Sequence, residues 1–123
     1  MFPDSSPRGA NIPGEEDSWD LGTGAGLYVN ATKEPWNKYY NMYDHVLKEI
    51  PQLIASEQIP IDVSRASIFG HSMGGHGALV MYLREQAHFR SVSAFAPICH
   101  PTNCETGKKL FEGYLAGGID DGK

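Results

Sequence analysis

Residues 70–74 read Gly-His-Ser-Met-Gly, and their position in the chain constrains the fold more than any other feature. A short apolar run at 66–69 leads directly into this pentapeptide, and a helix-like run at 75–83 follows it. When a buried strand enters a tight turn that opens a helix, the central side chain is raised above the edge of the sheet. The sequence therefore predicts a strand, a turn and a helix, with the Ser72 hydroxyl at the apex of the turn.

The glycines around Ser72 fit such a turn. A side chain at Gly70 or Gly74 would crowd it, and the small residues that follow let the helix lie close against the sheet; these are Gly75, Gly77 and Ala78. With these flanks the pattern indicates a serine nucleophile. The alternative is a serine in an ordinary glycine-rich turn.

The segment after Ser72 predicts the sheet topology. The helix is expected to reach about Gln86, and a second apolar run at 92–96 is closed by Pro97. A strand, a helix and a strand in this order imply a right-handed crossover and a parallel sheet. The fold class is therefore α/β.

The other segments are consistent with one small domain over residues 1–123. Residues 1–35 are rich in Gly and Pro and have almost no periodicity, as is typical of a loop at a functional site. A helix is expected over 36–59, with Pro51 either kinking it or standing in the first turn of a new helix. The strand, turn, helix and second strand occupy 64–96, and 97–123 is expected to be a loop with a short helix at 108–115.

Composition excludes several classes of function. The formal net charge is −5, and one Lys108-Lys109 pair makes no basic patch, so neither nucleic acid nor an anionic membrane is expected as a partner. No apolar run approaches the length of a membrane span and no signal-peptide pattern is present, so a cytoplasmic location is expected. The glycine-rich stretch at 22–26 lacks a preceding strand and a following lysine, which argues against a nucleotide cofactor.

The two cysteines are too few to indicate a disulfide framework. We expect free thiols. A metal site formed by Cys99, His100 and Cys104 is the less favoured alternative, because the histidines and cysteines do not have metal-ligand spacing.

A serine nucleophile needs a histidine as base and a carboxylate that orients the histidine. In this architecture the carboxylate and then the histidine follow the serine along the chain. Asp120 and Asp121 come last and have no histidine after them, so the triad is not completed within the chain. His71 is excluded as the base by adjacency, His76 is expected to be a surface or supporting polar group, and His88 is expected to be exposed at a helix end.

Four stretches of the sequence together resemble the S-formylglutathione hydrolase family, also called esterase D. The resemblance runs from Pro3 to about Leu115 and rests on residues 4–9, 18–26, 67–79 and 91–99. It implies an α/β-hydrolase fold and a cytosolic serine thioesterase that hydrolyses S-formylglutathione in formaldehyde detoxification, with side activity on small esters. It also implies that no metal or organic cofactor is needed.

The resemblance assigns roles to particular residues. Ser72 is the expected nucleophile, and the backbone N–H of Met73 is an expected oxyanion donor. Trp19 and His71 are the candidate substrate-binding residues, although Trp19 could instead be an aromatic plug that anchors its loop to the core. The expected partner is a small glutathione thioester, and a homodimer is left open.

The chain departs from the family in two respects. Family members are more than twice as long, so the chain looks like an internal fragment whose triad Asp and His lie beyond Lys123, and we expect it to be inactive by itself. Glu105-Thr106 stands where the family often has Pro-Trp, which puts the shape of the acyl pocket in question. The alternative function is that of a non-catalytic α/β-hydrolase relative acting as a binding module.

Overall fold

The computed structural model describes residues 1–123, which divide into two units: residues 1–42 with 99–123 form the first, and residues 43–98 form the second. None of the helices combines the length and the apolar character that crossing a membrane requires.

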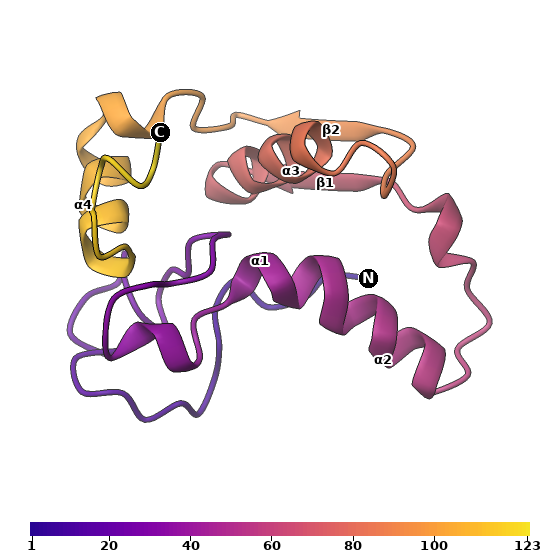
Figure 1. Cartoon of the computed structure of the whole chain (residues 1–123), viewed down its shortest axis with the longest axis horizontal. Helices are drawn as coiled ribbons and strands as arrows, with labels where there is room; N and C mark the ends of the chain where they lie inside the picture. Colours follow the sequence, from indigo (N-terminus) through magenta and orange to yellow (C-terminus); the bar gives the residue numbers. More distant parts are fainter. The chain divides into compact units, whose positions relative to one another are not determined.

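The second unit contains two strands and the helix that connects them. β1 (Ile68–His71) and β2 (Val92–Phe95) pair in parallel, and α3 (Met73–Arg84) lies against them (Figure 1). This confirms the predicted parallel pairing. β1 begins and ends two residues later than the apolar run at 66–69. The reason is its pairing with β2, which starts at Ile68 opposite Val92 and ends at His71 opposite Phe95.

Side chains alternate between the two faces of this sheet, as the period of a strand requires. Residues at every second position of β1 and β2 are partly buried, and the others are exposed. Phe69 and Phe95 belong to the exposed set, with 54% and 58% of their surface accessible. Since parallel sheets are ordinarily covered on both faces, this apolar face is a surface that a complete α/β fold would bury.

The helix expected over 36–59 is divided in the structure. A 3₁₀ turn, η1 (Trp36–Lys38), stands apart from a helical run made of α1 (Met42–Asp44), the π-helical η2 (His45–Glu49) and α2 (Ile50–Ser56). Pro51 lies in the first turn of α2, which confirms the second of the two predicted possibilities. The run ends before residue 59 because Gln58 adopts a left-handed conformation with φ 52°.

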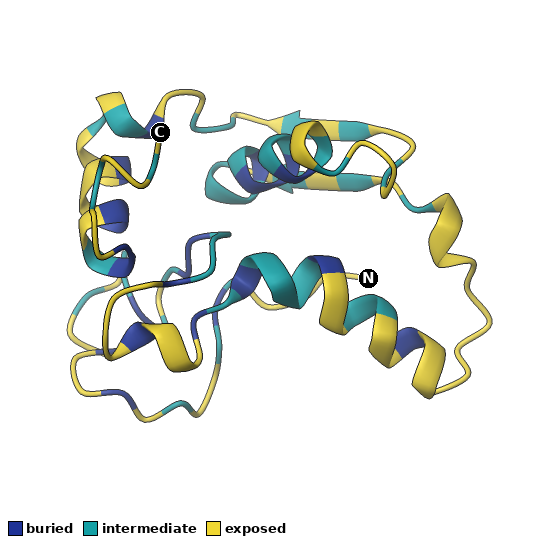
Figure 2. Ribbon diagram, viewed as in Figure 1, coloured by how far each residue is buried: buried dark blue, intermediate teal, exposed yellow.

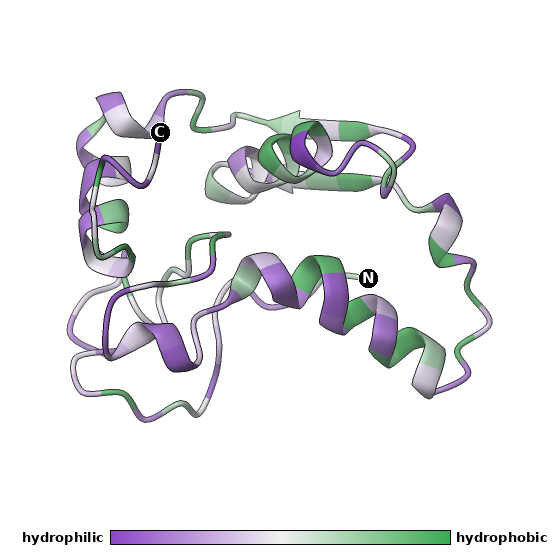
Figure 3. Ribbon diagram, viewed as in Figure 1, coloured by the Kyte–Doolittle hydropathy of each residue, from purple (hydrophilic) through white to green (hydrophobic).

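α2 is amphipathic, and apolar and polar bands alternate along it in Figure 3. Ile54 is buried, whereas Leu53 is 54% exposed. A further 3₁₀ turn, η3 (Val63–Arg65), then leads toward β1, and Asp62 caps it by accepting a 3.0 Å hydrogen bond from the backbone N–H of Ser64.

The first unit is built around an aromatic cluster and a C-terminal helix. Trp36 packs edge-on against Tyr40 and Tyr114, and the rings of Tyr40 and Tyr114 are stacked 5.5 Å apart. Tyr114 belongs to α4 (Glu105–Tyr114), whose buried positions appear dark blue in Figure 2; its buried residues are Gly107, Leu110, Phe111 and Tyr114.

α4 begins three residues earlier than the helix expected at 108–115. The reason is its N-terminal cap: the sulfur of Cys104, which follows η4 (Pro101–Asn103), accepts a 3.4 Å hydrogen bond from the backbone N–H of Gly107. At the other end, the backbone N–H groups of Thr32 and Lys33 donate to the carbonyl oxygen of Tyr114 at 2.9 and 3.1 Å. Part of the N-terminal loop region thus stabilises the C-terminus of α4.

Candidate active site

Ser72 occupies the turn between β1 and α3 in a conformation that few non-glycine residues adopt. Its φ is 54° and its ψ is −115°, and α3 starts at the next residue. A Cβ added to Gly70 would overlap the backbone carbonyl of Gly74, so the turn requires glycine at position 70. The predicted strand, strained turn and helix around Ser72 are all present.

The backbone of Ser72 is held by hydrogen bonds on both sides. Its N–H donates to the carbonyl oxygen of Phe95 at 2.9 Å, and its own carbonyl accepts from the N–H of His76 at 3.0 Å and from the N–H of Ile98 at 3.3 Å. Strained residues persist where surrounding contacts determine their conformation, and they are frequent at functional sites.

α3 approaches the strands closely at Gly75. A Cβ there would lie 3.1 Å from the carbonyl oxygen of Gly70, 3.2 Å from the Cβ of Pro97 and 3.3 Å from the carbonyl oxygen of Phe95. Gly75 is buried, as are Gly77 and Ala78. The small residues therefore allow the close packing that the sequence predicts.

Met73 is the first residue of α3. The N–H groups in the first turn of a helix have no partner within the helix, and the helix dipole adds partial positive charge there. The Met73 amide is thus suited to hydrogen-bonding an anion that forms beside Ser72.

The three histidines considered with Ser72 differ in their surroundings. His71 ends β1 and is exposed. His76 is partly buried in α3; burial lowers the pKa of its imidazole, and a hydrogen bond to the backbone of Ile98 partly opposes this shift. His88 is exposed beyond the end of α3, as predicted. Its Nδ1 lies 3.9 Å from a carboxylate oxygen of Glu85.

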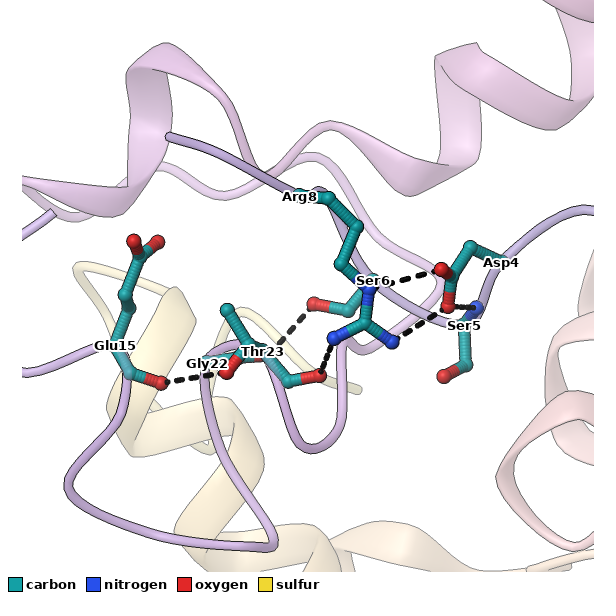
Figure 4. Close-up of polar contacts among 7 residues, drawn as sticks. All are labelled: Asp4, Ser5, Ser6, Arg8, Glu15, Gly22 and Thr23. Carbon is teal, nitrogen blue, oxygen red and sulfur yellow. Dashed lines mark hydrogen bonds and ion pairs between the residues drawn. The ribbon is translucent and has the colours of Figure 1, made fainter. Parts of the chain in front are cut away.

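The long loop of the first unit is ordered by side chain to backbone contacts, although it contains no helix. Arg8 donates to both carboxylate oxygens of Asp4, at 2.7 and 2.8 Å, and its third donor reaches the carbonyl of Thr23 at 2.8 Å (Figure 4). The guanidinium hydrogen bond lowers the pKa of the Asp4 carboxyl to about 2. Ser6 donates to the carbonyl of Gly22 at 2.6 Å.

Protein acceptors bind the N–H groups of the glycine-rich stretch. The N–H of Gly22 donates to the Tyr114 hydroxyl at 2.8 Å, and that hydroxyl donates to the carbonyl of Ala25 at 2.8 Å. The N–H of Thr23 donates to the carbonyl of Glu15 at 3.0 Å. This stretch is therefore anchored to α4, and sequence inspection gave no signal for the contribution of Tyr114, which lies far away in the chain.

Trp19 is 85% exposed, which contradicts the alternative that it plugs the core; the buried tryptophan of the unit is Trp36. The residues on either side of Trp19 are both held by Lys109 of α4, whose ammonium group lies 2.5 Å from the Asp20 carboxylate and 3.2 Å from the Ser18 hydroxyl. The hydrogen bond from Lys109 lowers the pKa of the Asp20 carboxyl. We call these three side chains, Ser18, Asp20 and Lys109, the Lys109 clamp.

Neither cysteine forms a disulfide; Cys99 is exposed and Cys104 is partly buried. No three His, Cys, Asp and Glu side chains lie close enough together to hold a metal ion.

Comparison with known proteins relates this geometry to a family. Residues 1–117 match the family model described as "Putative esterase". The chain is 61% identical to the S-formylglutathione hydrolase of Mus musculus over 123 residues and 57% identical to that of Arabidopsis thaliana over 115 residues. These matches cover 100% and 94% of the chain, but only 43% and 40% of the two relatives.

A solved structure supports the same relationship. An S-formylglutathione hydrolase from Agrobacterium tumefaciens superimposes with a TM-score of 0.85 at 49% identity, over 92% of this chain and 40% of that one. The chain therefore spans about two fifths of the length of the relatives that it matches. It belongs to the esterase family, has part of an α/β-hydrolase fold, and is similar in sequence to the S-formylglutathione hydrolases.

Proposed function

We propose that this chain is the nucleophile-bearing part of a serine thioesterase that hydrolyses S-formylglutathione to glutathione and formate. The observation that carries the proposal is the strained Ser72 between β1 and α3, with the Met73 amide beside it at the start of the helix. The 61% identity to the mouse S-formylglutathione hydrolase supports the substrate. Formaldehyde detoxification in the cytoplasm, with side activity on small esters, is the corresponding role.

The reaction has two steps. The Ser72 oxygen attacks the thioester carbonyl carbon while its proton passes to a histidine that lies outside residues 1–123. The Met73 N–H stabilises the oxyanion, the carbon–sulfur bond breaks, and the sulfur takes the proton and leaves as glutathione. Water then attacks the formyl ester and gives a proton to the same histidine. The bond to the Ser72 oxygen breaks, this oxygen takes the proton from the histidine, and formate is released. No metal or organic cofactor is required by these steps.

Trp19 and His71 are proposed to contact the substrate. The indole of Trp19 is exposed on a loop that the Lys109 clamp holds, and the His71 side chain is exposed next to Ser72 in the sequence. A glutathione thioester offers both apolar and charged groups to such side chains. Neither nucleic acid nor a membrane is proposed as a partner, and the homodimer is left open.

A chimeric enzyme tests the function. Residues 1–123 replace the stretch that they match in mouse S-formylglutathione hydrolase, and this protein is called the mouse chimera below. We expect it to hydrolyse S-formylglutathione, and we expect Ser72→Ala to remove nearly all turnover, since loss of a triad member leaves only about 10³ to 10⁴-fold acceleration over water.

Ser56→Ala is the matched control, because Ser56 is exposed at the end of α2 and bonds only to the Leu53 carbonyl. Peptide mapping after fluorophosphonate treatment should find the label on Ser72. A folded mouse chimera without turnover, or turnover that persists in Ser72→Ala, would contradict the proposal. Substrate binding without hydrolysis would favour the binding-module alternative.

A further inference from the structure

Trp19 combines an exposed side chain with a closely held backbone. The indole is 85% exposed. The backbone of Trp19 lies against Gly24, where an added Cβ would overlap the Trp19 carbonyl group. Gly24 does not have a positive φ, so the position requires glycine because of this contact and not because of its backbone conformation. The chain therefore presents the indole to solvent from a backbone that has little room to move.

Side chains also hold the residues on either side of Trp19. The Lys109 ammonium donates to the Asp20 carboxylate at 2.5 Å and to the Ser18 hydroxyl at 3.2 Å, and this hydroxyl donates to the same carboxylate. The Lys109 clamp is thus a closed ring of hydrogen bonds. Only 19% of the Asp20 side chain is exposed, so the ion pair is less screened by water than a fully exposed pair would be.

α4 contacts the same segment at a second point. Gly113 follows Lys109 by four residues, so the two lie on one face of the helix. A Cβ added to Gly113 would lie 2.9 Å from Cδ1 of Leu21, and glycine at this position therefore lets Leu21 pack against the helix. One face of α4 thus fixes the residues before and after Trp19, while the indole itself stays exposed.

An exposed indole on a fixed backbone is suited to binding a peptide. An indole has a large apolar face and one N–H donor. Binding normally costs the freedom of the side chains that it immobilises, and this cost is smaller where the free protein already holds the side chain in place. Glutathione is a tripeptide whose methylene and amide groups can pack on such a ring, whereas small esters and thioesters have no comparable part.

We propose that Lys109 is a positioning residue for glutathione recognition: through the Lys109 clamp it holds Trp19 ready to contact the peptide part of the thioester. The inference rests on the proposed function. Because bonds form and break at the formyl group and not in the peptide, loss of the clamp should weaken binding of glutathione thioesters and change kcat little. Selectivity for glutathione thioesters over small thioesters should fall with the binding.

The first experiment measures the kinetics of Lys109→Met in the mouse chimera. We expect KM for S-formylglutathione to rise about 3 to 10-fold, with kcat within about twofold of the parent. The ratio of kcat/KM for S-formylglutathione to kcat/KM for S-ethyl thioacetate, a thioester without a peptide, should fall. Lys108→Met is the matched control, because Lys108 is exposed and outside the clamp, and we expect it to match the parent. An unchanged KM and ratio in Lys109→Met would overturn the proposal.

A double variant tests whether Lys109 acts through Trp19. If it does, Lys109→Met has little left to remove once the indole is absent, so KM of the double variant should be within about twofold of KM of Trp19→Leu. Increases in KM that multiply in the double variant would show that Lys109 acts independently of Trp19, and would overturn the proposal.

Asp20→Ala separates positioning from simple charge attraction. Glutathione has a net negative charge at neutral pH, so removing a carboxylate would lower KM if the charges of the clamp acted directly on the substrate. Loss of the clamp instead raises KM, in the same direction as Lys109→Met. A lower KM in Asp20→Ala would overturn the proposal. Active sites are titrated with a fluorophosphonate, and loss of sites with an unchanged KM would show a purely structural role and also overturn it.

Binding of S-methylglutathione, a thioether that has no acyl group to hydrolyse, separates this inference from the proposed function. Its Kd is measured by isothermal titration calorimetry in the Ser72→Ala mouse chimera, with and without Lys109→Met, and we expect Kd to rise about 3 to 10-fold. If the mouse chimera folds but has no turnover, the proposed function is contradicted, and this binding alone decides whether Lys109 positions Trp19. No binding, or an unchanged Kd in Lys109→Met, would overturn the inference in either case.

Discussion

The backbone N–H of Ser72 donates a 2.9 Å hydrogen bond to the carbonyl oxygen of Phe95, the last residue of β2. The turn that carries the nucleophile is thereby attached to the neighbouring strand as well as to its own. A substitution that shifts β2 relative to β1 should therefore move Ser72, even where it lies far from the serine in the sequence.

The close approach at Gly70 predicts a large effect of a single methyl group. In Gly70→Ala the new Cβ would overlap the Gly74 carbonyl, so we expect the mouse chimera to lose about 3 kcal/mol of stability or more, together with Ser72 labelling. Gly75→Ala, whose Cβ would meet its neighbours at 3.1 to 3.3 Å, should cost less. Urea unfolding measures both changes, and the reverse order of costs would contradict the described turn.

The Tyr114 hydroxyl is expected to stabilise the first unit. Tyr114→Phe removes the partner of the Gly22 N–H and of the Ala25 carbonyl, and unpaired polar groups of this kind cost about 1 to 3 kcal/mol each. Tyr39→Phe is the control, because Tyr39 is 46% exposed. Both are compared by urea unfolding of the mouse chimera, and equal stability of the two variants would show that the hydroxyl does not anchor the loop.

Tyr40 should make stability depend on alkaline pH. Burial, and then the neighbouring Glu15 carboxylate, raise the pKa of Tyr40 to about 12 from an ordinary value of 10.0. Between these values the unfolded chain has lost the proton while the folded chain keeps it, so the free energy of unfolding falls as pH rises, by up to about 2 to 3 kcal/mol.

Tyr40→Phe has no such proton to lose, so its free energy of unfolding should fall less steeply between pH 10 and 12. Burial also raises the pKa of Tyr114, so part of the fall remains in the variant. Denaturant unfolding of the mouse chimera at several pH values gives the slopes. An identical slope in the variant would exclude this role of Tyr40.

The Lys109 clamp should restrict the motion of Trp19. Lys109→Met removes the group that lies 2.5 Å from Asp20 and 3.2 Å from Ser18, so we expect greater mobility of the indole. The mobility is measured by ¹⁹F NMR relaxation of 5-fluorotryptophan at position 19, assigned with Trp19→Phe. Lys108→Met is the matched control, because Lys108 is exposed and outside the clamp. Equal mobility in the two lysine variants would contradict the clamp.

Residues 1–123 expressed alone should neither hydrolyse S-formylglutathione nor fold well. The triad histidine and carboxylate are proposed to lie outside these residues, and a sheet of two strands leaves Phe69 and Phe95 exposed on one face. Turnover assays and amide hydrogen exchange test the two statements separately. Turnover near that of the mouse chimera, abolished by Ser72→Ala, would mean that a base exists within the chain.

The sequence by itself determined the local structure around Ser72. The apolar runs, the glycines at 70 and 75 and the position of Pro51 act through neighbours a few residues away, which is why the strand, turn, helix and helix restart were predictable. The positions of the helix ends were predicted less accurately. The start of α4 depends on the Cys104 cap, and the end of α2 depends on the left-handed conformation of Gln58.

Only the tertiary structure decided the contacts between residues distant in the chain. No local pattern predicts the bonds of the Tyr114 hydroxyl to the glycine-rich stretch, of Lys109 to both neighbours of Trp19, or of the Ile98 N–H to the Ser72 carbonyl. A side chain at such a position is chosen by the atoms that folding brings near it, and single-residue propensities and periodicity carry no information about those atoms.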